Sequence, residues 1–214
     1  MRPVIFDLDG TLIDSAPDIH ASVNAVLRDK GHAALSLDHV RSFIGGGVDL
    51  LWQQVLHHLD LPQGQRPDYV APFMARYQRS HTLTRLYPNA LEMLGVLADL
   101  GHPLGLCTNK PTVPARAVLD HFGMAHLFGA VICGDTLPSR KPAPEMPLET
   151  AARLGGGPAI FVGDSEIDAQ AAEAAGMPLL LFMQGYRKTP IAELPHHASF
   201  DDYAALPGLV ADMG

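Results

Sequence analysis

The chain has 214 residues, of which 47% are hydrophobic and 18% charged, and its formal net charge at pH 7 is −8. This length predicts one globular domain with an insertion, or two modest domains. The negative charge argues against a nucleic-acid backbone or an anionic membrane as the main partner, because neither favours an acidic surface. A small anionic substrate is compatible with this charge where basic side chains gather locally.

Cysteine usage and hydropathy bear on the compartment. Cys107 and Cys133 each lie in an apolar, strand-like run, so both are interpreted as buried thiols rather than as a disulfide or metal ligands. No apolar run approaches the roughly 20 residues that span a bilayer, and the N-terminus leaves no room for a cleaved leader. We therefore expect a cytoplasmic protein, either a monomer or a homodimer.

The first predicted element is a short buried strand at residues 4–6, which two acidic residues follow. The Gly-Thr pair at residues 10–11 marks a turn, so Asp7 and Asp9 come at the C-terminal end of the strand. Side chains alternate along an extended chain, which turns Leu8 toward the core and places both carboxylates in one site. Adjacent carboxylates require a cation, a shared proton, or both.

A helical pattern follows over about seventy residues. Gly31 is expected to end the first helix, and Ser36 to cap the second. The apolar positions that carry the four helices are Ile19, Val23, Val26 and Leu27; Val40, Phe43 and Ile44; Leu51, Val55 and Leu59; and Val70, Phe73, Met74 and Tyr77. Residues 15–85 are therefore predicted to form a compact helical unit, inserted after the first strand.

The glycine triplet at residues 45–47 has two interpretations. It is either a permissive turn between two helices, since glycine accepts positive φ without cost, or a loop whose backbone N–H groups approach a bound anion. The sequence favours neither.

Strands and helices alternate in the remainder of the chain. Residues 86–88 are expected to lead back to the core, with Asn89 as the cap of a helix, and strands are predicted at 104–107, 130–133, 159–162 and 178–182. The last of these is predicted to be the final strand, followed by loops from Gln184 and a short helix near Leu206. The alternation indicates an α/β fold, a Rossmann-like parallel sheet with right-handed crossovers, formed by residues 1–14 and 86–214.

Further acids follow a later strand of this sheet. Asp164 comes directly after the strand at 159–162, and Asp168 is four residues further on, so both are expected to face the strand ends. Taken singly, Asp164 could be a helix cap and Asp168 a favourable helix-dipole charge. Four convergent carboxylates, however, require a hard divalent cation, which predicts a Mg²⁺ site at Asp7, Asp9 and Asp164.

Lys141 lies between prolines in a segment that follows the third strand, Ser-Arg-Lys-Pro-Ala-Pro at 139–144. An exposed surface lysine is the ordinary interpretation. Because prolines stiffen the segment, it could instead deliver one cation to the acidic site, where positive charge would stabilise a transferring phosphoryl group.

Four segments in order resemble the four motifs of the haloacid dehalogenase superfamily. They are Asp-Leu-Asp-Gly-Thr-Leu-Ile-Asp-Ser at 7–15, Thr-Asn at 108–109, Lys-Pro at 141–142 and Gly-Asp-Ser-Glu-Ile-Asp at 163–168. Their spacing and the helical insertion are similar to those of the cap-bearing members, so the resemblance covers essentially the whole chain. It implies the superfamily's α/β core with an all-α cap.

The resemblance also implies a mechanism. Asp7 would attack phosphorus and form an aspartyl-phosphate, and Asp9 would protonate the leaving alcohol and later deprotonate the hydrolytic water. Thr108 and the backbone at Asn109 would bind phosphoryl oxygens, whose charge Lys141 would neutralise.

The same resemblance implies how Mg²⁺ is held. Asp164 would ligate the metal together with Asp7 and the backbone carbonyl of Asp9, and Asp168 would support the metal's water shell or orient Lys141.

Within the superfamily, residues 10–18, the Thr-Asn-Lys triplet at 108–110 and the glycine loop look like those of phosphoglycolate phosphatases. This similarity implies hydrolysis of 2-phosphoglycolate, with Lys110, Arg140 and the loop around Gly46 as candidates for binding the substrate carboxylate. The alternatives are another small-molecule phosphatase or a sugar-phosphate mutase of the same family. A dehalogenase or a non-catalytic phospho-receiver would leave Asp9 without a role.

Overall fold

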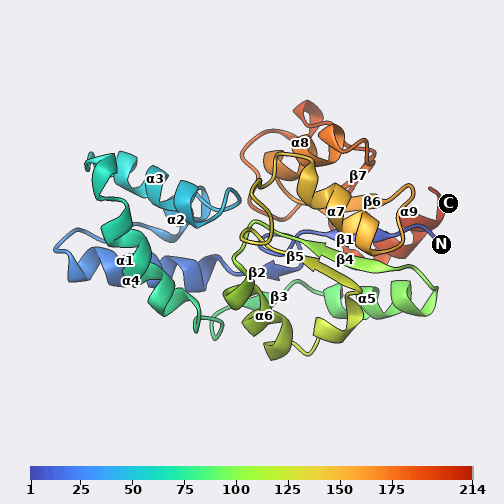
Figure 1. Cartoon of the computed structure of the whole chain (residues 1–214), viewed down its shortest axis with the longest axis horizontal. Coiled ribbons are helices and arrows are strands. Elements are labelled where there is room, and N and C mark those ends of the chain that lie inside the picture. Colours follow the sequence, from blue (N-terminus) through green and yellow to red (C-terminus); the bar gives the residue numbers. More distant parts are fainter. Residues whose placement is uncertain (214) are drawn as a thin grey trace.

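The structure is a computed structural model that describes residues 1–213, and its larger part is built on one parallel sheet (Figure 1). The six strands lie in the order β5-β4-β1-β6-β7-β8, so the first strand of the chain is flanked by β4 and β6. The strands are β1 (Val4–Phe6), β4 (Leu104–Cys107), β5 (Ala130–Ile132), β6 (Ile160–Gly163), β7 (Leu179–Phe182) and β8 (Ala198–Phe200).

Helices cover both faces of this sheet, as the near-continuous apolar strands require. Val4 and Phe6 belong to one buried cluster and Ile5 to the other, because successive side chains point to opposite faces. The first face packs on helices α5 (Ala90–Asp99), α6 (Thr112–His121) and α9 (Leu206–Ala211), and the second on α7 (Glu145–Arg153) and α8 (Glu166–Ala174). The predicted fold class is therefore confirmed.

The smaller part is a bundle of four helices with a hydrophobic cluster of its own. Trp52 is fully buried there, with its ring 5.3 Å from that of Tyr69 and 5.7 Å from that of Phe73. All buried members of this cluster lie between residues 19 and 77, so each part has a separate core. The helices of this unit, called the cap below, are α1 (Ala16–Asp29), α2 (Leu37–Arg41), α3 (Val48–His58) and α4 (Pro67–Tyr77).

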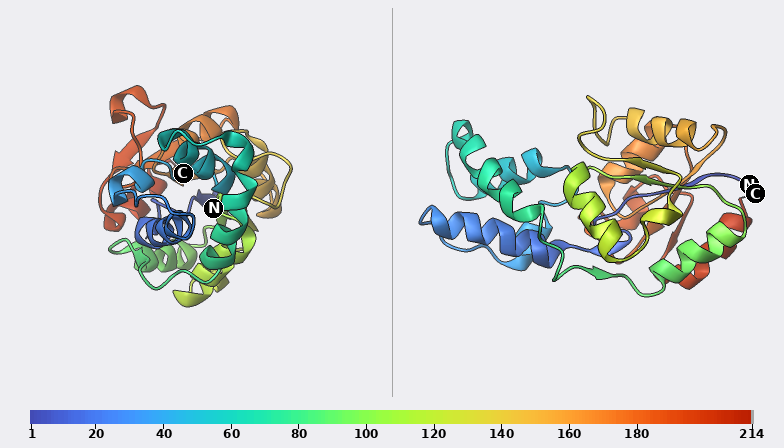
Figure 2. Two further views of the ribbon diagram at one scale, coloured as in Figure 1. Left: turned by 90° about the vertical axis from the view of Figure 1, so that its left-hand side faces the viewer. Right: turned by 60° about the horizontal axis from the view of Figure 1, so that its bottom comes forward.

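Two short strands connect the parts. β2 (Ile13–Asp14) and β3 (Arg85–Leu86) pair antiparallel, so the chain enters and leaves the cap side by side. The carboxylate of Asp18 supports this connection, because it accepts hydrogen bonds from the backbone N–H of Thr84 at 2.7 Å and from its hydroxyl at 2.6 Å. Both chain termini lie at the opposite end of the molecule from the cap (Figure 2).

Several local predictions are confirmed. The Ser36 side chain caps α2 by accepting from the backbone N–H of His39, and Gly31 follows the end of α1 with a φ of 77°. Cys107 and Cys133 are buried free thiols. Within residues 1–213, no helix has both the length and the apolar character needed to cross a bilayer.

One local prediction is wrong. The strand at 179–182 is not the last, because the three residues of β8 pair with β7 at the sheet edge. So short a segment, in which only Phe200 is buried, carries no periodic signal. Asn89 is the N-cap residue of α5, as predicted, but its side chain donates to Asp202 at 2.9 Å and makes no capping hydrogen bond. Short 3₁₀ helices lie at Gln63–Gln65, Ala125–Leu127, Ile191–Glu193 and Tyr203–Ala205.

The separate cores predict separate responses to large-to-small substitutions. Leu56→Ala, in the cap cluster, should destabilise its surroundings by about 2–5 kcal/mol and speed amide hydrogen exchange in α1–α4 while β1, β4 and β6 stay protected. Leu94→Ala, in the sheet cluster, is the matched control and should give the reverse pattern. Equal acceleration in both parts, measured by mass spectrometry, would show that they unfold as one unit.

Candidate active site

The C-terminal ends of β1 and β6 bring three buried carboxylates together. Asp7 follows β1 directly and Asp164 follows β6, its neighbour in the sheet. One oxygen each of Asp7, Asp164 and Asp168 lies within 4.8 Å of the others. The predicted convergence of these three acids is thus present in the structure.

Lys141 places its ammonium group among these acids. Its Nζ lies 2.9 Å from Oδ1 of Asp7 and 2.7 Å from Oδ1 of Asp168, and its side chain is only 1% exposed. Burial alone would lower the pKa of Lys141, but the ion pairs with Asp168 and Asp7 outweigh it and raise that pKa. Lys141 is therefore a permanent cation at the base of the site rather than an exposed surface residue.

Asn109 holds the Lys141 backbone in place. Its side-chain carbonyl accepts from the Lys141 backbone N–H at 3.1 Å, and its amide group donates to the Lys141 carbonyl at 2.9 Å. The same amide donates at 3.0 Å to the carbonyl of Gly45, in the glycine loop of the cap. Asn109 thereby joins the lysine segment to the cap.

Asp168 has protein partners for both of its carboxylate oxygens. Oδ1 pairs with Lys141, and Oδ2 accepts from the Ser165 hydroxyl at 2.7 Å and from the backbone N–H groups of Asp164 and Ser165 at 3.1 Å each. Ser165, not Asp164, is the N-cap of α8, so Asp164 lies outside the helix and the expected i, i+4 relation within one helix is wrong. Asp168 was expected either to support the water shell of the metal or to orient Lys141, and these contacts fit the second role.

Asp164 is fixed by contacts from two loops. Its Oδ1 accepts from the Thr11 hydroxyl at 2.7 Å and its Oδ2 from the backbone N–H of Tyr186 at 2.6 Å. A Cβ at Gly10, where φ is +88°, would lie 2.5 Å from the same carboxylate, and one at Gly185 would lie 2.2 Å away. Only glycine lets the backbone come this close.

These buried acids fit a hard divalent cation. Burial raises the pKa of Asp7 to about 6; the positive charge of Lys141 lowers this pKa and the negative charge of Asp168 raises it. The pKa of Asp164 is also raised, by burial and by its acidic neighbours Asp168 and Asp7. The Lys141 ammonium lies 2.9 Å from Oδ1 of Asp7, but this buried oxygen has no hydrogen bond of good geometry. Carboxylates whose ionised form is destabilised by burial, and which offer only oxygen as a ligand atom, match the ligands that Mg²⁺ prefers.

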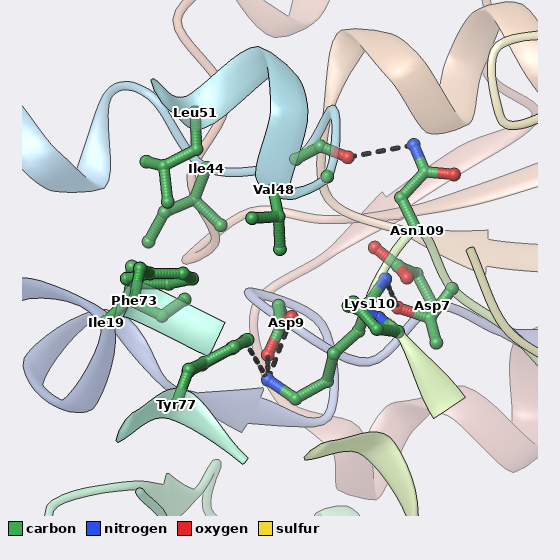
Figure 3. A pocket seen from close by; sticks show the side chains of 14 residues that line it. Asp7, Asp9, Ile19, Ile44, Val48, Leu51, Phe73, Tyr77, Asn109 and Lys110 are labelled. Carbon is green, nitrogen blue, oxygen red and sulfur yellow. Dashed lines mark hydrogen bonds and ion pairs between the residues drawn. The ribbon is translucent and has the colours of Figure 1, made fainter. Parts of the chain in front are cut away.

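The Asp9 carboxylate contacts Lys110 at the pocket wall and has partners separate from those of Asp7 (Figure 3). Its Oδ1 accepts from the Ser15 hydroxyl at 2.6 Å, and its two oxygens lie 2.9 and 3.2 Å from Nζ of Lys110. Lys110 also donates to the hydroxyl of Tyr77, at the end of cap helix α4. The Asp9 carboxylate is thus not one of the three clustered acids, and metal ligation by Asp9 stays a prediction.

A pocket opens between the strand ends and the cap. Asp7, Asp9 and Thr108 line its sheet side, and Gly45 and Gly47 its edge, whereas Gly46 and Arg140 are not among the lining residues. Arg140 donates instead to the carbonyl of Gly134 within its own loop. The apolar lining residues are Ile19, Ile44, Val48, Leu51, Phe73 and Pro111.

Two tyrosines of the site were not predicted from the sequence. Tyr77 was assigned only to the apolar face of a helix, and Tyr186 lay in a segment interpreted as loop. Nothing in the local sequence distinguishes a buried tyrosine whose hydroxyl contacts a remote lysine from one that only packs. A Gly-Tyr pair after the last predicted strand was the one available signal for Tyr186.

Comparisons with known proteins agree with this geometry. A profile described as haloacid dehalogenase-like hydrolase matches residues 4–182. The chain is 47% identical over 209 residues to a phosphoglycolate phosphatase of Rhodobacter capsulatus, covering 97% of this chain and 95% of that protein. It is 38% identical over 214 residues to a phosphoglycolate phosphatase of Rhodospirillum rubrum, covering 96% and 89%.

Solved structures give the same result for the fold. A predicted phosphoglycolate phosphatase from Haemophilus somnus superposes with a TM-score of 0.91 at 33% identity, covering 98% of each chain. A HAD-superfamily hydrolase from Geobacter sulfurreducens superposes with a TM-score of 0.77 at 27% identity, covering 98% of this chain and 99% of the other. The similarity therefore extends over both the sheet and the cap.

The raised pKa of Asp7 predicts how stability depends on pH in metal-free protein. Between the unfolded value of 3.8 and the folded value of about 6, the folded state binds more protons, so the free energy of unfolding should fall as pH rises through this range. Asp7→Asn should flatten this slope and raise the melting temperature at pH 7 in the presence of a chelator.

Asp99→Asn is the control for this measurement, because Asp99 is exposed and its substitution removes a carboxylate charge from the surface, not from the interior. Added Mg²⁺ should stabilise the wild type more than Asp7→Asn. An unchanged pH slope in Asp7→Asn would contradict the assignment of the buried charge to this residue.

Proposed function

The chain belongs to the haloacid dehalogenase-like hydrolases and is a phosphatase, and we propose that it hydrolyses 2-phosphoglycolate to glycolate and phosphate. The observation that carries the proposal is the position of Asp7, which stands at the end of β1 between a buried ammonium and a small pocket. The similarity to phosphoglycolate phosphatases over almost the whole chain supports the substrate.

Asp7 acts as the nucleophile in this proposal. Its carboxylate attacks phosphorus and displaces the alcohol, forming an aspartyl-phosphate that water then hydrolyses, which divides one difficult displacement into two easier ones. Lys141, 2.9 Å away, faces the charge that builds up on the phosphoryl oxygens. The Thr108 hydroxyl accepts from the backbone N–H of Lys110 at 3.2 Å, which leaves its own hydrogen to donate to a phosphoryl oxygen.

Asp9 is the proposed general acid and base. It protonates the leaving oxygen of glycolate in the first step and takes a proton from the attacking water in the second. Its contacts with Ser15 and Lys110 hold the carboxylate at the pocket wall, beside the nucleophile but out of the acid cluster. Two carboxylates two residues apart can thus perform different tasks.

Mg²⁺ is the proposed cofactor. Asp7 and Asp164 would hold it, together with the backbone carbonyl of Asp9, and Asp168 would act on the site through Lys141. When bound, Mg²⁺ supplies positive charge to the transferring phosphoryl group. The under-stabilised carboxylates of Asp7 and Asp164 support this assignment.

Substitution of the two aspartates tests the mechanism. Asp7→Asn should lower phosphate release from phosphoglycolate by at least about a thousandfold, because it removes the nucleophile. Asp9→Asn should lower it by about 10²–10⁴-fold, the contribution of general acid–base catalysis. Acid-quenched Asp9→Asn should carry a phosphate on Asp7, detectable by mass spectrometry, and Asp99→Asn is the matched control.

A substrate panel tests the specificity. Mg²⁺-dependent release would be compared for phosphoglycolate, sugar phosphates, nucleotides, pyrophosphate and an aryl phosphate, and phosphoglycolate should stand far above the others. Similar release from all of them would contradict the proposed substrate but not the phosphatase activity. Transfer of phosphate between positions of a sugar, without release, would indicate a mutase instead.

A further inference from the structure

The proposed substrate carries a carboxylate that needs a partner in the pocket, and the following inference rests on that proposed function. Among the described residues that line the pocket, Lys110 is the one cation. The cap contributes mainly apolar side chains to the wall, and these offer no donor to an anion (Figure 3). A carboxylate buried there without a donor would be strongly destabilised.

Lys110 and Tyr77 stand together at this wall. The Lys110 side chain is 2% exposed, and its Nζ donates to the Tyr77 hydroxyl and lies 4.5 Å from the centre of the Tyr77 ring. The Tyr77 hydroxyl oxygen accepts from Lys110, so the hydroxyl hydrogen of Tyr77 must point away from Lys110. Within residues 1–213 this hydrogen has no acceptor. Both side chains line the pocket.

The position of this pair matches the length of the substrate. Lys110 is bound to Asp9, the residue that serves the leaving oxygen, with Nζ 2.9 Å from Oδ1. In phosphoglycolate the carboxylate carbon is separated from the leaving oxygen by a single methylene group. A carboxylate so close to the leaving oxygen falls beside Lys110, whereas a longer polar leaving group would extend onto the apolar wall.

The other candidates for this role are less well placed. Arg140 is outside the pocket lining and is engaged by the carbonyl of Gly134. Lys141 is buried under Asp7, where it pairs with two carboxylates and faces the phosphoryl position. Gly46 is also outside the lining.

We propose that Lys110 and Tyr77 form the binding site for the substrate carboxylate and thereby select short, anionic leaving groups. The carboxylate accepts the free hydrogen of the Tyr77 hydroxyl. The substrate carboxylate also accepts a hydrogen bond from Lys110, in place of the longer contact that Nζ of Lys110 makes with Oδ2 of Asp9 at 3.2 Å. Lys110 then bridges the leaving group and Asp9, and Tyr77 makes selection depend on the cap.

Ethyl phosphate provides the comparison, because it is similar in shape to phosphoglycolate at the leaving group but lacks the carboxylate. The measured quantity is the ratio of kcat/KM for phosphoglycolate to kcat/KM for ethyl phosphate. Tyr77→Phe, which removes one hydroxyl, should lower this ratio at least about tenfold, the effect of losing a hydrogen bond to a charged group. Lys110→Gln should lower it further.

The control is Tyr69→Phe, which removes a hydroxyl from the same helix. Tyr69 is buried in the cap cluster, bonds to His32 at 2.9 Å and does not line the pocket, so the ratio should not change. Titration calorimetry in an Asp7→Asn background separates binding from turnover. There, the dissociation constant for phosphoglycolate should rise about tenfold in Tyr77→Phe, and that for ethyl phosphate much less.

The outcomes separate this inference from the proposed function. A wild type that prefers phosphoglycolate, with Tyr77→Phe and Lys110→Gln folded and keeping the same ratio, would overturn the carboxylate site and leave the phosphatase assignment intact. A wild type without preference for phosphoglycolate would overturn both the proposed substrate and the site. A ratio that falls in both variants but not in Tyr69→Phe supports the inference.

Discussion

The structure depends on an unbalanced set of buried charges at the end of the central strand. Three carboxylates, those of Asp7, Asp164 and Asp168, face one buried ammonium, that of Lys141. Asp7 and Asp168 share this one ammonium, and burial together with the acidic neighbours destabilises the ionised form of Asp164, so a further cation would be favourable here. A divalent cation would offset the excess of negative charge, so the cluster is suited to bind a metal and, beside it, a phosphate.

A second lysine–aspartate pair lies at the pocket wall, and in the proposed mechanism it would serve selection while the first serves the chemistry. Asp7 is paired with Lys141 beneath the pocket, whereas Asp9 is paired with Lys110 at the pocket wall. The first pair contains only residues of the sheet part, and the second reaches the cap through Tyr77. The side chains of Asp7 and Lys141 thus contact each other within the core, while Lys110, beside the proposed position of the leaving group, contacts a side chain of the cap. Different caps on one core could then select different substrates.

The sequence predicts what is encoded locally and misses what depends on distant contacts. Buried strands such as residues 4–6 and 104–107 show as apolar runs, and each places its polar residues at a known end, which is why Asp7, Thr108 and Asp164 could be located. The sequence could not distinguish a capping role of Asp168 from a metal-binding role, because an acidic residue near the start of a helix suits both. Tyr77 could not be found, since its partner is 33 residues away in the chain.

The loop after β7 links the acid cluster to the connection between the two parts. Tyr186 donates from its backbone N–H to Asp164, and its hydroxyl accepts from the N–H groups of Ser15 at 2.8 Å and Ala16 at 3.0 Å while donating to Asp14 at 2.7 Å. These contacts satisfy backbone donors at the start of α1 that would otherwise lack partners. The first turn of the cap is therefore fastened to the same residue that holds a proposed metal ligand. A rotation of the cap about this connection would have to leave Ala16 in place or break the three hydrogen bonds that the Tyr186 hydroxyl makes. Tyr186 thereby ties the position of the cap entry to that of Asp164.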